Sequence, residues 1–358
     1  MIARVGRATI KQVANLAGVS TQTVSRVIND RPDVSGPTRK RVQRIIDELG
    51  YQPSALARSL IRQRSYTLGV VTAGLRHIGP SRTLGGITAA AAEAGYSLLL
   101  EELPRYDSEE IAPLLQALRS RQVDGVIWAV PEVGGNRRWI NRLSSEFDLP
   151  IVYLAMEPRP NVCMVSVNNY LGGRLVMAHL LEQGYRRIAH IAGPLDWWEA
   201  RQRMAAWKDT LTEAGIQVRE QDWVEGAWSS ASGSEAAQRL LDQTPDLDAV
   251  FAANDQMALG VMHVAAQRRH RVPRDLGVAG FDNVPESAYF CPALTTVQQD
   301  QHNVGRVAVE EIIRIVEAGW DGRTAIEPKS IMLSPILVVR QSSDRLRTSA
   351  EGGAQARD

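Results

Sequence analysis

The sequence is short of several features, and each shortage excludes a class of protein. Its two cysteines, Cys163 and Cys291, are too few for a disulfide framework, and their apolar or aromatic neighbours in the sequence indicate buried, reduced thiols. No apolar run reaches the roughly 18 residues that a membrane span needs. No amino-terminal apolar core marks a secretory signal, because Lys11 and polar residues interrupt every candidate. We therefore expect a cytoplasmic protein that does not bind a membrane.

Signatures of enzymes and metal sites are missing as well. The sequence has no Gly-x-Ser-x-Gly elbow, no P-loop and no cluster of His and Cys with the spacing of metal ligands, and its six histidines are scattered. We expect no catalytic residues, no metal and no cofactor. Binding is the expected function.

The net charge of +1 conceals a basic amino-terminal end. Residues 1–64 carry 12 Lys and Arg against 4 Asp and Glu, whereas the remainder carries 29 against 36. A local excess of positive charge attracts the phosphate backbone of nucleic acid. The 358 residues also exceed what one hydrophobic core usually organises, so two or three domains are expected.

Residues 9–29 predict two short helices joined by a tight turn. Apolar residues recur at helical spacing before Gly18 and again after Ser20. Thr9 with Gln12 fits a capping box, and Ser20 can cap the second helix. The polar face of that helix carries hydroxyl, amide and guanidinium groups that suit base edges in the major groove, although a plain helical hairpin fits the same pattern. The candidates for DNA contact are Thr21, Gln22, Thr23, Ser25, Arg26 and Asn29.

A third helix is expected between a Ser35 cap and Gly50, so that residues 1–50 form one small all-α domain. Residues 51–60 predict a further helix that is too short to be stable alone in water. We expect residues 51–65 to form a hinge and linker, of which the helix becomes ordered only on DNA.

Two stretches identify the chain as a member of the lactose repressor (LacI/GalR) family. They are Ala-Gly-Val-Ser-x-Gln-Thr-Val-Ser-Arg-Val-Ile-Asn at 17–29 and Tyr-x-Pro-x-Ala-x-Ala-Arg-Ser-Leu at 51–60. The resemblance implies a homodimer on double-stranded operator DNA, with hinge helices that enter the minor groove and insert a leucine between bases. The alternative for that leucine is a linker residue that packs on the core. The matching hinge residues are Ser54, Ala57, Arg58 and Leu60.

From Tyr66 onward, short apolar runs alternate with amphipathic segments, which is typical of parallel sheets covered by helices in an α/β body. Expected strands are 67–72, 97–101, 124–130, 151–155, 188–192, 248–252 and 277–281, and expected helices are 82–95, 109–121, 136–147, 169–183, 199–214, 232–243 and 255–269.

The resemblance supplies the finer topology of this body, residues 66–340. It implies two doubly wound parallel-sheet subdomains of the periplasmic-binding-protein kind, three crossovers and a cleft at the carboxyl ends of the strands. The expected limits are 66–166 with 298–328 for the first subdomain and 167–297 with 329–340 for the second. Residues 341–358 lack leucine heptads and predict a disordered tail.

Several further matches fall where this family lines its effector cleft. They include Gly-Pro-Leu-x-x-x-x-Ala-Arg-x-Arg at 193–203, Glu-Gly-x-Trp-Ser at 225–229 and Gly-Phe-Asp at 280–282. Of the neighbours Trp197 and Trp198 at most one can face a ligand, and Trp198 is taken as that residue. The expected effector site is His77, Pro80, Trp198, Arg201, Arg203, Trp228, Asn254, Asp282 and Gln299.

These residue types suit a sugar, because planar Asp, Asn and Arg groups bridge adjacent hydroxyls and a Trp face packs on the C–H side of the ring. Several have structural alternatives. Asn254, Asp255 and Asp282 can cap helices, Arg201 can be an ion-pair partner, and Trp228 can belong to the core.

Ala129 and Ala155 replace an Asn and an Asp of the lactose repressor, so a different effector is expected, such as a larger saccharide or a glycoside. The expected function is operator repression that is relieved by a small carbohydrate inducer. A corepressor resembling a purine is the alternative, and a plain solute-binding protein is a third possibility.

Overall fold

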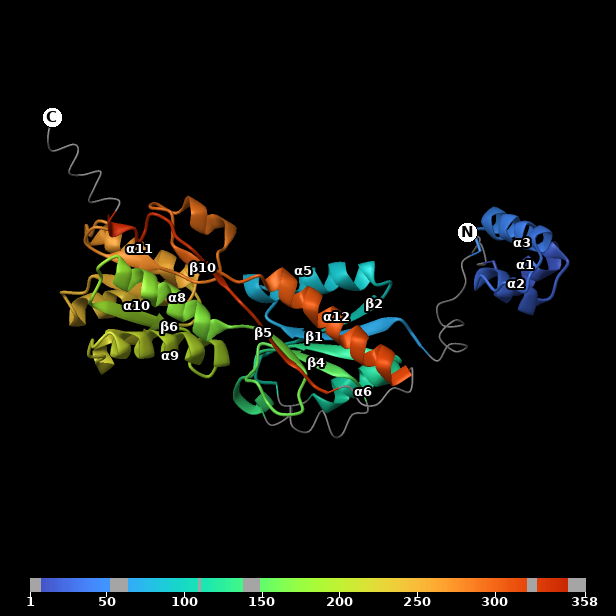
Figure 1. The fold of residues 1–358 in the computed structure, drawn as a ribbon, viewed down its shortest axis with the longest axis horizontal. Helices are drawn as coiled ribbons and strands as arrows, with labels where there is room; N and C mark the ends of the chain where they lie inside the picture. Colours follow the sequence, from blue (N-terminus) through green and yellow to red (C-terminus); the bar gives the residue numbers. More distant parts are fainter. Residues whose placement is uncertain (1–7, 52–63, 109–110, 138–148, 321–326, 347–358) are drawn as a thin grey trace, which may run out of the picture. The chain divides into compact units, whose positions relative to one another are not determined.

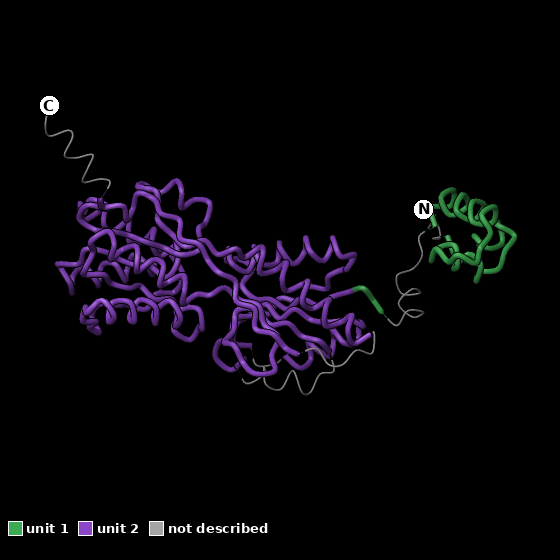
Figure 2. Tube along the Cα trace, in the orientation of Figure 1, with its two compact units in different colours: residues 1–66 green, residues 67–358 purple. Residues whose placement is uncertain are grey.

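The computed structural model describes residues 8–51, 64–108, 111–137, 149–320 and 327–346. It divides into two compact units, residues 1–66 and 67–358 (Figure 2). Four expected DNA contacts, Ser54, Ala57, Arg58 and Leu60, lie outside the described residues. So do most of the helix expected over 136–147 and the end of the chain from residue 347.

Unit 1 contains three helices whose ends follow the sequence signals closely. The Thr9 side chain accepts from the Gln12 backbone, and the Gln12 side chain accepts from the Thr9 backbone at 2.8 Å, so the capping box is confirmed. Ser20 caps the second helix by accepting from Thr23 N at 3.1 Å. Ser35 occupies the N-cap position of the third helix as expected, but its hydroxyl donates to the Thr38 hydroxyl and makes no capping hydrogen bond to a backbone N–H. The helices are α1 (Ile10–Ala17), α2 (Thr21–Ile28) and α3 (Gly36–Leu49).

One small apolar core holds these three helices together. Each helix is too short to be stable alone, so burial of its apolar face against the other two supplies most of its stability. The polar side of α2 remains at the surface. The buried core residues are Val13, Ala14, Ala17, Val24, Val27, Val42 and Ile45.

Unit 2 contains two lobes, and the first lobe is built on a six-stranded parallel sheet in the order β11-β5-β4-β3-β1-β2. Helix α6 packs on one face, while α5 and α12 lie together on the other (Figure 1). Strand β1 is buried along nearly its whole length, as expected for a sheet covered on both faces. The elements are β1 (Thr67–Ala73), α5 (Ile78–Glu93), β2 (Ser97–Leu103), α6 (Ala112–Ser120), β3 (Gly125–Ala129), β4 (Ile151–Leu154), β5 (Met164–Val167), α12 (Gln301–Trp320) and β11 (Ser330–Leu333).

The second lobe has a four-stranded parallel sheet in the order β7-β6-β8-β9 and a two-stranded antiparallel pair, β10 with β12. Helices α8 and α9 cover one face of the larger sheet, and α10 and α11 cover the other. The elements are α8 (Asn169–Glu182), β6 (Ile188–Ala192), α9 (Trp198–Glu213), β7 (Trp223–Glu225), α10 (Ser230–Gln243), β8 (Ala249–Ala252), α11 (Asp255–Gln267), β9 (Gly277–Ala279), β10 (Thr296–Gln298) and β12 (Ile336–Val338).

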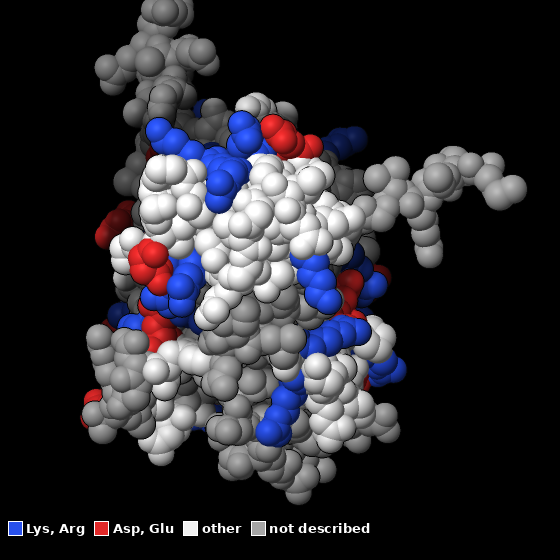
Figure 3. All heavy atoms as spheres, turned by 90° about the vertical axis from the view of Figure 1, so that its right-hand side faces the viewer, with Lys and Arg blue, Asp and Glu red and all other residues white. Residues whose placement is uncertain are grey.

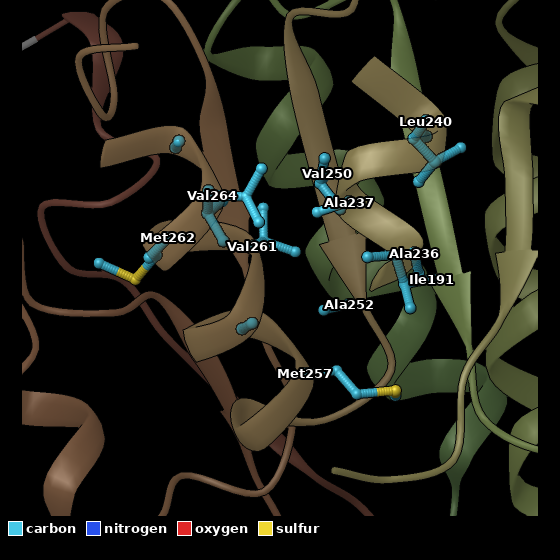
Figure 4. Close-up of a cluster of buried hydrophobic side chains, with 14 of the residues drawn as sticks. Ile191, Ala236, Ala237, Leu240, Val250, Ala252, Met257, Val261, Met262 and Val264 are labelled. Atoms are coloured by element: carbon cyan, nitrogen blue, oxygen red, sulfur yellow. The ribbon is translucent and has the colours of Figure 1, made fainter. Parts of the chain in front are cut away.

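The core of the second lobe is formed by short apolar side chains between its sheet and helices. Figure 4 shows Ile191 and Val250 from the strands facing Leu240 and Val261 from the helices. All four are buried, so the strand ends that carry polar residues are held on a rigid base. The helical headpiece and the α/β body with two parallel sheets are thus as the sequence predicts.

The chain crosses between the lobes three times, at 167–169, 298–301 and 333–336. The third crossing differs from expectation. Strand β11 pairs with β5 of the first sheet, so the chain returns to the second lobe after Leu333 and not at 329. The expected boundary was early because β11 is a short, half-buried edge strand that the sequence pattern does not separate from the segment after it.

The expected disorder over 341–358 is wrong for residues 341–346. Ser342 and Ser343 are fully buried. Val278 N donates to Ser342 O at 2.8 Å, and the Ser342 hydroxyl donates to Val278 O at 2.6 Å. The segment is therefore a buried turn that is hydrogen-bonded to β9, and its two small polar side chains are satisfied inside the protein.

The two cysteines have different environments. Cys163 is buried as expected, and burial raises the pKa of its thiol to about 11. Cys291 is exposed, so its expected burial is wrong. Among the described helices, none combines the length and apolar character that crossing a membrane requires.

Candidate functional site

A cavity of about 500 Å³ lies between the two lobes of unit 2. Residues that follow the carboxyl ends of the parallel strands line it, together with the starts of α5, α8, α9, α11 and α12. This is the general position of ligand sites in open α/β sheets. Seven of the nine expected effector residues line it: His77, Pro80, Arg203, Trp228, Asn254, Asp282 and Gln299.

Trp198 and Arg201 do not line the cavity, and the helical period explains why. Glu199 and Arg203 are four residues apart on α9 and share the face that meets the cavity. Arg201 lies between them in sequence and donates instead to the backbone oxygens of the loop before α9. Trp198 is buried, and its neighbour Trp197 lines the cavity instead.

A polar network crosses the cavity from one lobe to the other. Thr83 of α5 donates to Gln301 at 2.9 Å, and Gln301 donates to Gln299 at 3.0 Å. Gln299 donates to Asp282 at 2.5 Å. Asp282 in turn lies 3.9 Å from Arg203. The lobes are therefore coupled through side chains that line the cavity.

Arg203 is the most enclosed charge of this network. Its guanidinium donates to Asn169 Oδ1 from Nε at 2.9 Å and from Nη2 at 2.8 Å, and it also donates to Ala253 O. Burial lowers its pKa and raises the pKa of Asp282, while the attraction between the two charges opposes both shifts. Arg203 and Asp282 lie too far apart for a close ion pair, so each can still form hydrogen bonds with a polar ligand in the cavity.

Asn254 caps a helix, which was the structural alternative to its expected role in the effector site. Its Oδ1 accepts from Met257 N at 2.9 Å and so caps α11, while its Nδ2 donates to Trp228 O at 3.1 Å. Asp255 is not the cap. Its buried carboxylate accepts from Val284 N at 2.8 Å and from the Thr296 hydroxyl at 2.5 Å. Burial, followed by the nearby charge of Asp282, raises the pKa of Asp255 to about 8.

A series of aromatic rings forms one side of the cavity. The ring centroids of Tyr106 and Trp197 are 4.9 Å apart, and those of Trp197 and Trp228 are 5.8 Å apart. His77 lies 6.3 Å from Tyr106 at the other end. The Arg203 guanidinium lies 5.6 Å from the Trp228 ring, so the aromatic series meets the polar network at Trp228.

Two glycines allow these rings to lie where they do. A Cβ at Gly193, directly after β6, would stand 2.0 Å from the Trp228 ring. A Cβ at Gly74, directly after β1, would stand 1.7 Å from the Tyr106 hydroxyl. Each lobe therefore seats one aromatic ring of the cavity against a glycine at the end of a strand.

Backbone strain is concentrated around the cavity. Ala155, Trp228 and Asp282 all line it and have φ angles of +54°, +60° and +112°. Left-handed backbone is costly for residues with a side chain and persists where surrounding structure imposes it, most often at functional sites.

Three cavity-lining residues hold a buried polar atom with no hydrogen-bond partner among the described residues. These atoms are Tyr106 Oη, Glu199 Oε2 and Trp228 Nε1. Burial raises the pKa of Glu199 to about 7. An unpaired buried polar atom costs about 1–3 kcal/mol, so a ligand that supplies partners gains that stabilisation.

The site also includes residues that the expected set lacked, notably Tyr106, Asn169, Trp197, Glu199 and Gln301. Trp197 was weighed in the sequence against its neighbour Trp198 and was not chosen. Tyr106, Asn169 and Gln301 carry no motif, because each is a single polar residue beside the end of a strand or the start of a helix.

Asp196, two residues before the first residue of α9, joins the lobes beside the cavity. Its Oδ2 accepts from Gly134 N at 2.7 Å, and its Oδ1 accepts from Arg137 at 2.9 Å. Arg137 also donates to the Asp196 backbone oxygen. The next residue, Trp197, contacts Tyr106 of the first lobe, so two consecutive residues of the second lobe contact the first.

In unit 1, the surface of α2 divides its polar residues into two groups. Thr21, Gln22 and Arg26 are exposed. Asn29 Nδ2 donates to Ser25 O at 2.8 Å and so helps to end the helix. Thr23 is half-buried and contacts the Ser20 hydroxyl at 2.9 Å. On the face of the chain that Figure 3 shows, basic side chains are spread among uncharged ones and acidic side chains are fewer.

A helical unit with an exposed polar second helix, joined to a two-lobed α/β body with an interlobe cavity, defines a DNA-binding regulator with a separate receptor. Residues 9–54 match the family of bacterial regulatory proteins called lacI, and residues 177–343 match the periplasmic binding protein-like domain.

Full-length relatives agree with these matches. The ribose operon repressor of Escherichia coli K12 is 33% identical over 337 residues, which cover 94% of this chain and 100% of the relative. The PurR repressor of Aliivibrio salmonicida is 32% identical over 341 residues, which cover 95% and 100%.

Solved structures match the same fold. A lac repressor dimer bound to operator and an anti-inducer has a TM-score of 0.84 at 31% identity, with 94% of this chain and 99% of that chain covered. A complex of the regulator CelR with cellobiose has a TM-score of 0.70 at 32% identity, with 94% and 100% covered. The chain belongs to the LacI family, whose members are DNA-binding transcriptional repressors and not enzymes.

Proposed function

We propose that this repressor binds its operator as a homodimer and releases it when a small neutral carbohydrate occupies the interlobe cavity. The observation that carries the proposal is the network of Asn169, Arg203, Asp282 and Gln299 beside the Trp228 ring. Planar amide, guanidinium and carboxylate groups next to an aromatic face are suited to a hydroxylated ring.

The aromatic rings favour a carbohydrate over a purine-like corepressor. A nucleobase is held best between rings that are parallel to one another. Among the described residues the neighbouring ring planes meet at 67° for Tyr106 with Trp197 and at 70° for Trp197 with Trp228. This arrangement offers single faces and edges, on which the C–H groups of a sugar can pack.

Operator recognition is assigned to α2. Its exposed Thr21, Gln22 and Arg26 present a hydroxyl, an amide and a guanidinium group, which read donor and acceptor patterns in the major groove. The lac repressor relative was solved as a dimer on its operator, which supports the same assembly here. Tyr289, with 85% of its surface exposed, and Leu259, with 40%, are apolar surface residues that a second copy can cover.

The ligand acts through its different affinity for two arrangements of the lobes. Residues of the cavity come from both lobes, so a ligand that contacts both favours the closed arrangement. The change is passed to the hinge, where Leu60 is assigned to the minor groove by the family resemblance.

Electrophoretic mobility shift tests the proposal. An operator is first selected from random duplexes by the protein itself, and its complex is then titrated with monosaccharides, disaccharides and purine bases. Release by at least one neutral sugar supports the proposal. Tighter binding with hypoxanthine or guanine, and no response to any sugar, replaces it with the corepressor reading. Leu60→Ala is expected to weaken binding of the selected operator more than binding of random DNA, and to reduce DNA bending in a circular-permutation assay.

A further inference from the structure

The cavity extends beyond the polar network, and this extension indicates the size of the ligand. Its volume of about 500 Å³ is well above that of one hexose. Arg203 and Asp282 lie beside Trp228, while Tyr106 and Trp197 continue the wall away from them, with centroid separations of 5.8 and 4.9 Å along the series. One ring held at Trp228 therefore leaves an aromatic surface uncovered.

The unpartnered polar atoms of the cavity lining specify the chemistry of the ligand. Trp228 Nε1 only donates a hydrogen bond, the ionised Glu199 carboxylate only accepts, and the Tyr106 hydroxyl does either. A group that serves both Trp228 and Glu199 must accept and donate, and sugar hydroxyls do both. A phosphate or carboxylate cannot donate to the ionised form of Glu199, and its negative charge is repelled by that form.

The charges that line the cavity also disfavour an anion. Arg203 and Arg76 are matched in number by the carboxyl groups of Asp282 and Glu199, which balance them when both are ionised. Arg203 is already engaged by Asn169 and lies near Asp282, and exposed Arg76 donates to His77 at 3.3 Å. Within the described lining no basic side chain is left in excess for a negatively charged ligand.

We propose that the cavity has two sugar subsites, so that its ligand is an uncharged disaccharide or a glycoside of that size. One ring lies at Trp228 against Arg203 and Asp282, and the other lies on Tyr106 and Trp197 with a hydroxyl that donates to Glu199. This inference rests on the proposed carbohydrate function and adds the size and charge of the ligand to it.

Isothermal titration calorimetry on the full-length protein tests the inference. The probes are cellobiose, maltose, lactose, trehalose and sucrose, the monosaccharides glucose, galactose and ribose, and the anions glucuronate and glucose 6-phosphate. We expect one disaccharide to bind at least 30-fold more tightly than its constituent monosaccharides and neither anion to bind.

The outcomes separate this inference from the proposed function. A monosaccharide that binds as tightly as every disaccharide overturns the two subsites but leaves the carbohydrate function standing. A sugar phosphate or uronate that binds best overturns the assigned charge. Absence of binding by every sugar, together with tighter operator binding with a purine base in the mobility shift, overturns both.

Variants locate the second subsite with the disaccharide that binds best. Trp197→Ala is expected to lower the affinity for that disaccharide about 10-fold and to keep the affinity for monosaccharides within about 2-fold of wild type. Trp320→Ala is the matched control, because that Trp is exposed on α12 and does not line the cavity.

Glu199→Gln keeps the shape of the side chain and an accepting oxygen while it removes the charge. We expect the disaccharide to retain its affinity within about 5-fold and the matching aldonate, in which the reducing end is oxidised to a carboxylate, to gain about 10-fold. An aldonate that binds wild type and Glu199→Gln equally overturns the role of Glu199. Because this substitution is conservative, the test does not depend on a variant that fails to fold.

Discussion

Replacement of Asp196 by Ala tests whether the contact between the lobes sets the affinity for ligand. The substitution removes the hydrogen bond from Gly134 N at 2.7 Å and the ion pair with Arg137 at 2.9 Å. It leaves Trp197 and the rest of the cavity lining in place. We expect the closed arrangement of the lobes to lose stability and the fold of each lobe to stay intact.

The size of this effect follows from the exposure of the partners. The side chains of Arg137 and Asp196 are 37% and 52% exposed, so solvent screens their ion pair to well under about 1 kcal/mol. The hydrogen bond from the Gly134 amide adds about 1 kcal/mol. Together they stabilise the closed arrangement by about 1–2 kcal/mol, which is about a 5- to 30-fold change in its equilibrium with the open arrangement.

Two measurements follow this change. Hydrogen exchange with mass spectrometry reports the Gly134 amide directly, and a peptide that contains it is expected to exchange faster in Asp196→Ala without ligand. The effector concentration that releases half of the operator is expected to rise by up to 30-fold, because a ligand that needs the closed state binds in proportion to its population.

Asp246→Ala is the matched control, because Asp246 forms a similar exposed pair with Arg187 at 2.7 Å within the second lobe alone. Hydrogen exchange at Gly134 and effector-induced release of the operator are expected to be the same in Asp246→Ala as in wild type. If Asp196→Ala exchanges and releases operator like wild type, or if Asp246→Ala shows the same loss, the contact does not control closure.

Four other outcomes are expected. Gly193→Ala should displace the Trp228 ring, because its Cβ would stand 2.0 Å from that ring. We expect effector binding to weaken at least 10-fold in titration calorimetry and the operator affinity of the ligand-free protein to stay unchanged; normal effector affinity contradicts this. Arg203→Ala should bind operator but not respond to effector in mobility shifts, and a normal response removes Arg203 from the site. Gln22→Ala should lose about 5- to 150-fold in affinity for selected operator and little for random DNA, whereas an equal loss on both means that Gln22 reads no base. Burial raises the pKa of Glu199 from 4.5 in the unfolded chain to about 7, so its contribution to stability is full below pH 4.5 and is lost as pH rises through 7. The melting temperature of wild type should therefore fall more between pH 5.5 and 8 than that of Glu199→Gln. Parallel melting curves of the two proteins against pH contradict the shift.

Much of the fold was predictable because local signals and burial agree. The Thr9 and Gln12 pair fixes the start of α1 through contacts only three residues apart. Long buried strands such as β1 consist mostly of apolar residues. The missed elements include strands of three or four residues, such as β5 and β7, whose pairing depends on distant partners and leaves little trace in sequence. The expected elements also lacked helix α12 (Gln301–Trp320), although its buried apolar residues recur at helical spacing.

The candidate site was predictable where a motif marks the end of a strand, as for Trp228 and Asp282. It was wrong where the helical register decided between neighbours, because Arg201 and Arg203 lie on different sides of α9. Tyr106 was missed because its position depends on Gly74, which is distant in sequence and whose missing side chain gives the ring its place.

Ser342 and Ser343 are buried beside β9 in the second lobe, although they are made long after that strand. During translation, unit 1 emerges first and can fold while the receptor still lacks these residues. A prematurely terminated chain that stops before Ser342 is therefore expected to fold its unit 1 but to form a destabilised receptor that binds effector weakly. A response to effector is thus expected only after the whole polypeptide has been made.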